Sequence, residues 1–192
     1  MRGQAFEHVK DCAARLVSAP LAFNATAERD IPERQRLAGL IRALLAQPLP
    51  VRVRLRAHLE DLARVLAREP SLWPESAALR LAGLPWKDIP DATRVLLALA
   101  EETREEPFFA SGLTTTVASA VDHRGTEWTP EGLLQLAQAV TGPLPLVAVV
   151  LVSTAGHRLN WREDAAQALR ALRQHPSAAV RAAAFGLLTA NE

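Results

Sequence analysis

One pair of residues in this 192-residue chain has a spacing suited to metal chemistry. His8 and Cys12 lie four residues apart, which would place two metal ligands on one face of a helix, with Glu7 and Asp11 beside them. No second pair of ligands accompanies them, and cysteine is commonly a small buried apolar residue. The sequence also contains no G-x-S-x-G, Walker or G-x-G-x-x-G motif. These observations favour a non-enzymatic protein with no metal site and no cofactor.

Charged residues are separated along the chain, although the formal net charge is only +1. Residues 29–68 hold nine arginines against four acids, whereas residues 69–131 hold five basic residues against eleven acids. Such a separation suits electrostatic complementarity with a partner. The candidate partner-binding residues come from both segments: Arg52, Arg54, Arg56, Glu101, Glu102, Glu105 and Glu106.

These charges also have structural interpretations. On a helix, Arg52 and Arg56 share one side and Arg54 points away, so the arginines fit a solvated surface as well. The four glutamates would crowd the C-terminal end of a helix, where acids oppose the helix dipole. They form a solvated helix end, pair with the arginines inside the fold, or bind a basic partner.

Four tryptophans, at positions 73, 86, 128 and 161, each fall at or just before a predicted helix start. An apolar residue there packs the turn that leads into the helix. Aromatic side chains along one face of a helical array could instead stack nucleic-acid bases. We favour packing.

Proline residues divide the chain into about ten predicted helices, because proline is tolerated only in the first turn of a helix or beyond its end. The third of these helices is predicted over 51–69, since an apolar stripe runs unbroken from Val51 to Leu66. Capping-box spacing predicts that Asp30 and Asn160 precede helices. The other predicted helices include 4–19, 74–82 and helices that follow Pro90, Thr129 and Ser177.

Two segments are ambiguous. Residues 107–122 contain Gly112, three threonines and Val117, which are mediocre helix formers, and we assign a helix there. The β-branched run within 143–156 fits either a buried strand or a helix buried all round. A lone strand would have no partner elsewhere in the chain, so we favour the helix. The sequence therefore predicts an all-α protein.

The segment Ala168–Leu188, ALRALRQHPSAAVRAAAFGLL, resembles one unit of a HEAT repeat. Its pattern Leu172-x₇-Val180-Arg181-x₂-Ala184 is echoed by Leu45-x₇-Val53-Arg54-x₂-Ala57. The two Val-Arg pairs lie 127 residues apart, close to three repeats of about 42 residues. The resemblance is clear over 160–190 and extends to 33–68.

This resemblance implies stacked antiparallel helical hairpins in a HEAT-like α–α superhelix, forming one domain over 1–192. It implies that Val180 packs between paired helices and that Arg181 bridges to an acid in the neighbouring repeat. Gln174-His175 departs from the acidic residue common in that turn. A helical array normally ends in a polar capping helix, so we expect a partner to cover this end, or the chain to be a fragment of a longer protein.

We therefore expect a cytoplasmic scaffold that binds another protein or a neighbouring domain. The single cysteine fits a reducing compartment. Leu144–Val152, the longest apolar run, is too short for a membrane span. The alternative is a nucleic-acid-binding protein similar to alkylpurine DNA glycosylases, whose nearest candidates are Trp161 with Asp164, Trp86 with Asp88, and Arg52 and Arg56 for phosphates. A HEAT-like lyase that acts on a chromophore is a third possibility.

Overall fold

The protein is all-α in the computed structural model, which describes residues 2–18, 27–69, 72–82, 84, 88–105, 108–122 and 128–187. Within those residues the chain forms eleven helices and no strand. It divides into two compact units, Met1–Leu84 (unit 1) and Pro85–Glu192 (unit 2). None of the described helices has the length and apolar character that a membrane crossing requires.

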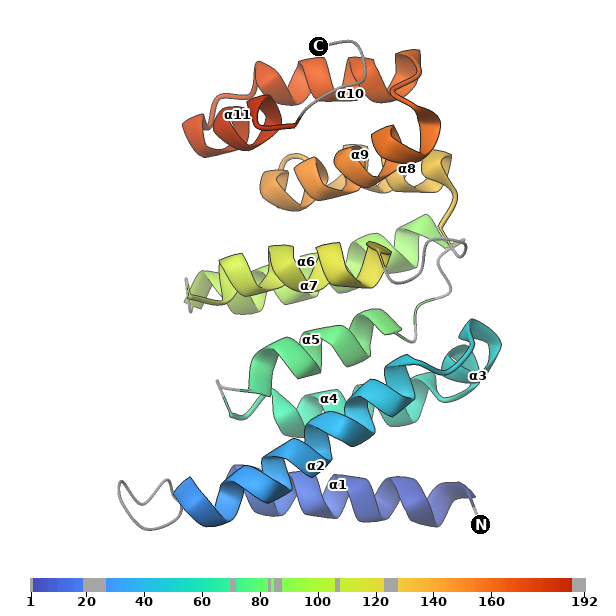
Figure 1. Cartoon of the computed structure of the whole chain (residues 1–192), viewed down its shortest axis with the longest axis vertical. Coiled ribbons are helices and arrows are strands. Elements are labelled where there is room, and N and C mark those ends of the chain that lie inside the picture. Colours follow the sequence, from blue (N-terminus) through green and yellow to red (C-terminus); the bar gives the residue numbers. More distant parts are fainter. Residues whose placement is uncertain are drawn as a thin grey trace. The chain divides into compact units, whose positions relative to one another are not determined.

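Unit 1 consists of two helical hairpins and one short extra helix (Figure 1). Within it, α1 packs against α2 and α4 against α5, while α1 also contacts α4 and α2 contacts α5. The two hairpins therefore stack helix upon helix, and the short α3 contacts α4 and α5. The helices of unit 1 are α1 (Arg2–Ser18), α2 (Ala27–Leu45), α3 (Leu49–Arg54), α4 (Arg56–Leu66) and α5 (Trp73–Ala82).

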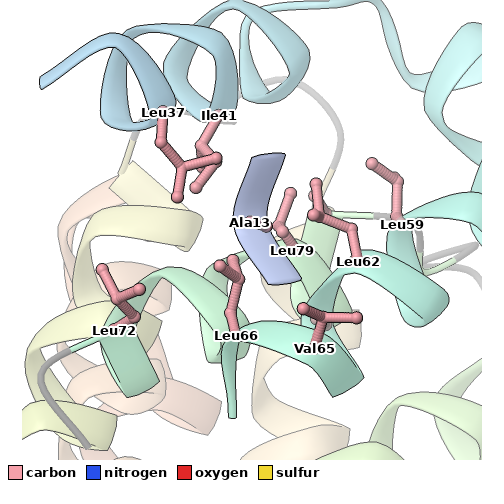
Figure 2. Close-up of a cluster of buried hydrophobic side chains, with 11 residues drawn as sticks. Ala13, Leu37, Ile41, Leu59, Leu62, Val65, Leu66, Leu72 and Leu79 are labelled. Atoms are coloured by element: carbon pink, nitrogen blue, oxygen red, sulfur yellow. The ribbon is translucent and has the colours of Figure 1, made fainter. Parts of the chain in front are cut away.

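The core of unit 1 is built by helix-spaced leucines. Leu59, Leu62 and Leu66 recur at three- and four-residue intervals, so they lie on one face of α4 and are almost fully buried. Figure 2 shows them near Leu37 and Ile41, which come from α2. Removing such a side chain from water contributes about 1.5–3 kcal/mol, which explains why an amphipathic stripe suffices to fix these helices.

Unit 2 consists of three stacked hairpins (Figure 1). The paired helices are α6 with α7, α8 with α9, and α10 with α11, and contacts also join α6 to α8, α7 to α9 and α9 to α11. Helix α9 additionally contacts α10, so it lies at the centre of the unit. The helices are α6 (Ile89–Glu105), α7 (Phe108–Asp122), α8 (Pro130–Val140), α9 (Pro145–Leu159), α10 (Glu163–Arg173) and α11 (Ala178–Phe185).

Several helix predictions are confirmed. The two ambiguous segments form α7 and α9, and the β-branched residues Val147, Val149 and Val152 are buried on α9. Thr129 caps α8, since its Oγ1 accepts a hydrogen bond from the Gly132 amide at 3.1 Å. Both units contain stacked helical hairpins, as predicted for an all-α fold.

The predicted helix over 51–69 is wrong in one respect, because it is two helices. The backbone leaves helical geometry at Leu55, with φ −93° and ψ 2°. Arg52 of α3 donates a hydrogen bond to the Leu45 carbonyl at the end of α2. Helix α4, which carries the leucine stripe, packs against α1 and α5. The break changes the direction of the chain between the Arg52 contact and the leucine stripe, although both helices contact α5.

Two predicted caps are also wrong. Helix α2 begins at Ala27, so Asp30 lies inside the helix and does not precede it. Asn160 ends α9 in the left-handed conformation, with φ 47°, and α10 begins only after Arg162. Ser177 does precede α11, but its side chain makes no capping hydrogen bond. Instead, His175 Nδ1 accepts a hydrogen bond from the Ser177 amide at 3.1 Å.

Candidate functional site

The three predicted arginines differ in their exposure and contacts. Arg52 is buried, at 3% exposure, and its Nη1 donates to the Leu45 carbonyl at 3.2 Å. Arg56 is half-buried, and its Nε donates to Glu60 Oε1 at 2.9 Å. Only Arg54 is exposed, and its Nε donates to the Pro50 carbonyl at 3.2 Å. Arg52 is therefore part of the framework of unit 1, and the interpretation of it as a surface residue is wrong.

The predicted acidic cluster is only partly described. Glu101 is exposed and pairs with Arg104, with 2.7 Å between Oε2 and Nη1. Glu102 is half-buried. The side chain of Glu105 and all of Glu106 lie outside the described residues. An exposed ion pair such as Glu101–Arg104 contributes about 0–1 kcal/mol, so this end of α6 fits a solvated helix end.

The Val-Arg pair near the C-terminus acts within its own hairpin. Val180 is almost fully buried, as the resemblance to HEAT repeats implies. Arg181, however, bridges to no acid in the part of the chain that the structure describes. Its Nη1 donates to the carbonyls of His175 and Pro176 at 2.8 and 2.6 Å. These carbonyls belong to the turn before α11, so Arg181 holds that turn in place. The implied bridge to a neighbouring repeat is wrong for this residue.

Three of the four tryptophans pack inside the protein. Trp73, Trp128 and Trp161 are all buried, which confirms the packing interpretation for them, whereas Trp86 lies outside the described residues. A buried indole cannot present its ring to a nucleic-acid base. Trp161 therefore cannot stack on a base as the nucleic-acid hypothesis requires of the Trp161–Asp164 pair.

The His8–Cys12 pair lies in contact with Arg15. His8 Nε2 lies 3.9 Å from Cys12 Sγ, and Arg15 Nη2 lies 3.3 Å from the same sulfur. Among the described residues, no group of three histidine, cysteine, aspartate or glutamate side chains could hold a metal ion.

A groove lies between α8 and α10 of unit 2. It has a volume of about 770 Å³ and lies wholly within this unit. Its polar lining comes from one face of each helix, because the residues recur at intervals of three, four and seven. Helix α8 contributes Glu131, Gln135 and Gln138, Thr141 directly follows α8, and α10 contributes Asp164 and Gln167.

Small apolar side chains create the space in this groove. Ala137 of α8 and Val152 of α9 are buried beneath it, and Ala168 and Ala171 of α10 line it from the other side. Alanine has no side-chain atoms beyond Cβ, so these helices approach without filling the gap between them. The groove therefore has an apolar floor and a polar rim.

The two carboxylates lie at the same end of the groove. Short turns at 141–144 and 160–162 connect α8 to α9 and α9 to α10, and each reverses the chain direction. Helices α8 and α10 thus run in the same direction, and Figure 1 shows both beginning on the same side of unit 2. Glu131 and Asp164 each occupy the second position of their helix, where the helix dipole favours an acid.

Five polar side chains on the rim have no partner among the residues that the structure describes. Glu131, Gln135, Gln138, Asp164 and Gln167 are exposed and make no hydrogen bond or ion pair with the part of the chain that the structure describes. Their neighbour Glu163 differs, because it pairs with Arg170. The rim therefore presents two carboxylates and three carboxamides whose hydrogen-bonding capacity is available to a partner.

Among the polar rim residues, the sequence pointed to Asp164 alone as a candidate functional residue, in a nucleic-acid site. A signal was present in the i, i+4, i+7 series of Glu131, Gln135 and Gln138. The series alone reads as an ordinary solvated helix face, because nothing in it shows that α10 lies opposite.

Comparisons with known proteins add no assignment to this geometry. No protein-family model matches the chain. No curated protein and no solved structure matches it either. The function must therefore be argued from the residues of the groove.

Proposed function

We propose that this protein is a non-enzymatic helical-repeat scaffold of the cytoplasm, which binds another protein in the groove between α8 and α10. The observation that carries the proposal is the unpartnered polar rim over an alanine-rich floor. Apolar floors with a few polar groups that fix orientation are typical of binding sites. The resemblance of Ala168–Leu188 to a HEAT repeat supports the same role, since such arrays present extended surfaces to partners.

The charge of the groove favours a protein over a nucleic acid. Its described lining includes two carboxylates and neither lysine nor arginine. Phosphate-backbone binding depends on basic side chains that neutralise phosphates, and carboxylates would repel the same groups. The burial of Trp161 also favours a protein over a nucleic acid, because its ring is not available for base stacking.

A variant that fills the groove tests this proposal. Ala171 is exposed and lines the groove, so Ala171→Trp would place a large ring in the binding space without disturbing the core. Ala182 is exposed on α11 and does not line the groove, so Ala182→Trp is the matched control. We expect immobilised wild-type protein and A182W to retain the same partner from a cell extract, and A171W to lose it.

Two results would overturn the proposal. One is that quantitative mass spectrometry finds no protein that distinguishes the wild type from A171W. The other is that duplex DNA binds the full chain at low salt and is lost in A171W, because the groove would then be a nucleic-acid site.

A further inference from the structure

We infer that the groove between α8 and α10 selects an extended, basic segment of the partner protein, with a lysine or arginine held by Glu131 and Asp164. This inference rests on the proposed function and specifies what occupies the groove. It is carried by the juxtaposition of an acidic end with a row of unpartnered carboxamides.

Among the described lining residues, no basic side chain neutralises the acidic end. Helix α10 does carry two arginines, but Arg170 pairs with Glu163. Arg173 is turned toward α11, where its Nε and Nη2 donate to the carbonyls of Ala184 and Leu187 at 3.3 and 3.2 Å. Arg162 precedes α10 and does not line the groove.

The neighbouring acids Glu163 and Asp164 of α10 therefore differ in their pairing. Glu163 is paired within the helix, whereas Asp164 faces the groove and is not paired in the described part of the chain. Two carboxylates at one end of a groove, with no internal cation, are complementary to an ammonium or guanidinium group. This charge complementarity identifies the partner's residue type at that end.

The carboxamides suit the main chain of an extended segment. Each glutamine side chain offers two N–H donors and a carbonyl acceptor, which match the carbonyl and N–H of a peptide group. Residues three apart on a helix, such as Gln135 and Gln138, lie about 5–6 Å apart. Peptide groups on the same side of an extended chain recur about every 6.6 Å, which is close enough for flexible side chains to follow.

A helical partner would not use these groups, because the peptide groups in the middle of a helix already bond to one another. The length of the rim also suits a short linear segment. Glu131 to Thr141 spans about 15 Å at the helical rise per residue. An extended chain advances about 3.3 Å per residue, so the groove would hold about four or five residues.

A randomised octapeptide library displayed on phage tests the inference with the full chain. Peptides are selected on the wild type after depletion on A171W, then synthesised and measured by fluorescence anisotropy. We expect lysine or arginine to be enriched at one position. We expect Glu131→Gln and Asp164→Asn each to weaken binding about twofold to fivefold, the range of exposed ion pairs. Glu163→Gln is the matched control and should leave binding unchanged.

A second measurement tests the carboxamides. N-methylation of alternate peptide nitrogens removes main-chain donors, and we expect it to weaken binding of the selected peptide. Gln138→Ala and Gln167→Ala should weaken binding as well. Gln174→Ala should not, because Gln174 follows α10 and does not line the groove.

The outcomes separate this inference from the proposed function. Some selected peptides will compete with the protein partner and bind A171W poorly. If these peptides carry no basic residue, or if E131Q and D164N leave their binding unchanged, the inference alone is overturned. A library that yields no peptide specific for the open groove overturns it too. The proposed function fails separately, when the capture experiment finds no protein that distinguishes A171W from the wild type.

Discussion

Gly156 lies directly beneath the indole of Trp161. A Cβ atom built on Gly156 would lie 2.7 Å from Trp161 Cη2 and closer still to Cζ3 and Cε3. The Trp161 amide also donates to the Gly156 carbonyl at 2.8 Å, and Trp161 itself has φ 54°. A bulky residue rarely adopts positive φ. The turn from α9 into α10 places the indole against Gly156, where a side chain would clash with the ring.

Gly156→Ala should destabilise unit 2 by about 1–3 kcal/mol, because the added methyl group overpacks a buried ring. Gly142→Ala is the matched control, since a Cβ there meets nothing within 4 Å. Urea unfolding gives the stability difference, and hydrogen exchange should localise it to α9 and α10. Equal stability of the two variants would contradict the close packing of Gly156 against Trp161.

Arg158→Lys should destabilise unit 2 by about 1–3 kcal/mol. The guanidinium donates through Nη1 to the Trp128 carbonyl and through Nη2 to the Val121 carbonyl, both at 2.9 Å. It thus joins α9 to the end of α7 and to the residue before the Thr129 cap of α8. Lysine has one compact ammonium group in place of the forked donors.

Arg104→Lys provides the comparison for Arg158→Lys, because Arg104 makes an exposed ion pair with Glu101. We expect its midpoint of thermal unfolding to match the wild type. A thermal shift of the same size for both variants would show that Arg158 does not join the helices.

Arg52→Met should destabilise unit 1 by about 1.5–3 kcal/mol, although methionine preserves much of the side-chain volume. Arg52 is buried and bonds the Leu45 carbonyl at the end of α2, and removal of a charged donor leaves that acceptor unsatisfied. Arg54→Met, at an exposed neighbour, should change the free energy of unfolding by less than about 0.5 kcal/mol. Partner binding should survive both changes, since neither residue lies in unit 2. Loss of partner binding in a well-folded R54M variant would show that the arginine segment contributes to the binding surface.

Leu62→Ala should destabilise unit 1 by about 2–5 kcal/mol, because it removes a fully buried side chain and leaves a cavity. Leu62 lies in the cluster of Figure 2 with Leu37 and Ile41. Leu40→Ala is the control, because Leu40 lies on α2 with Leu37 and Ile41 but is 46% exposed. Guanidinium unfolding followed by circular dichroism compares the two, and a similar loss in both would contradict the assignment of this core.

The sequence by itself determined the fold class and most of the helices, because these depend on local patterns. The leucine stripe of α4 and the Thr129-Pro130 start of α8 are readable within a few residues. Even the β-branched α9 could be assigned, since no other segment offered a partner strand. The break at Leu55 was not readable, because the apolar stripe continues through it. The end of α9 at Asn160 was missed because a residue in left-handed geometry there shares its sequence signal with a capping residue.

Only the tertiary structure decided which polar residues are available to a partner. Arg52 and Arg54 are both candidate partner-binding residues in the sequence, yet one is buried against the Leu45 carbonyl and the other is exposed. Glu163 and Asp164 are adjacent, yet one pairs with Arg170 and the other faces the groove. The physical reason is that a helical pattern fixes the angle between side chains on one helix, whereas availability depends on what the neighbouring helices place opposite them.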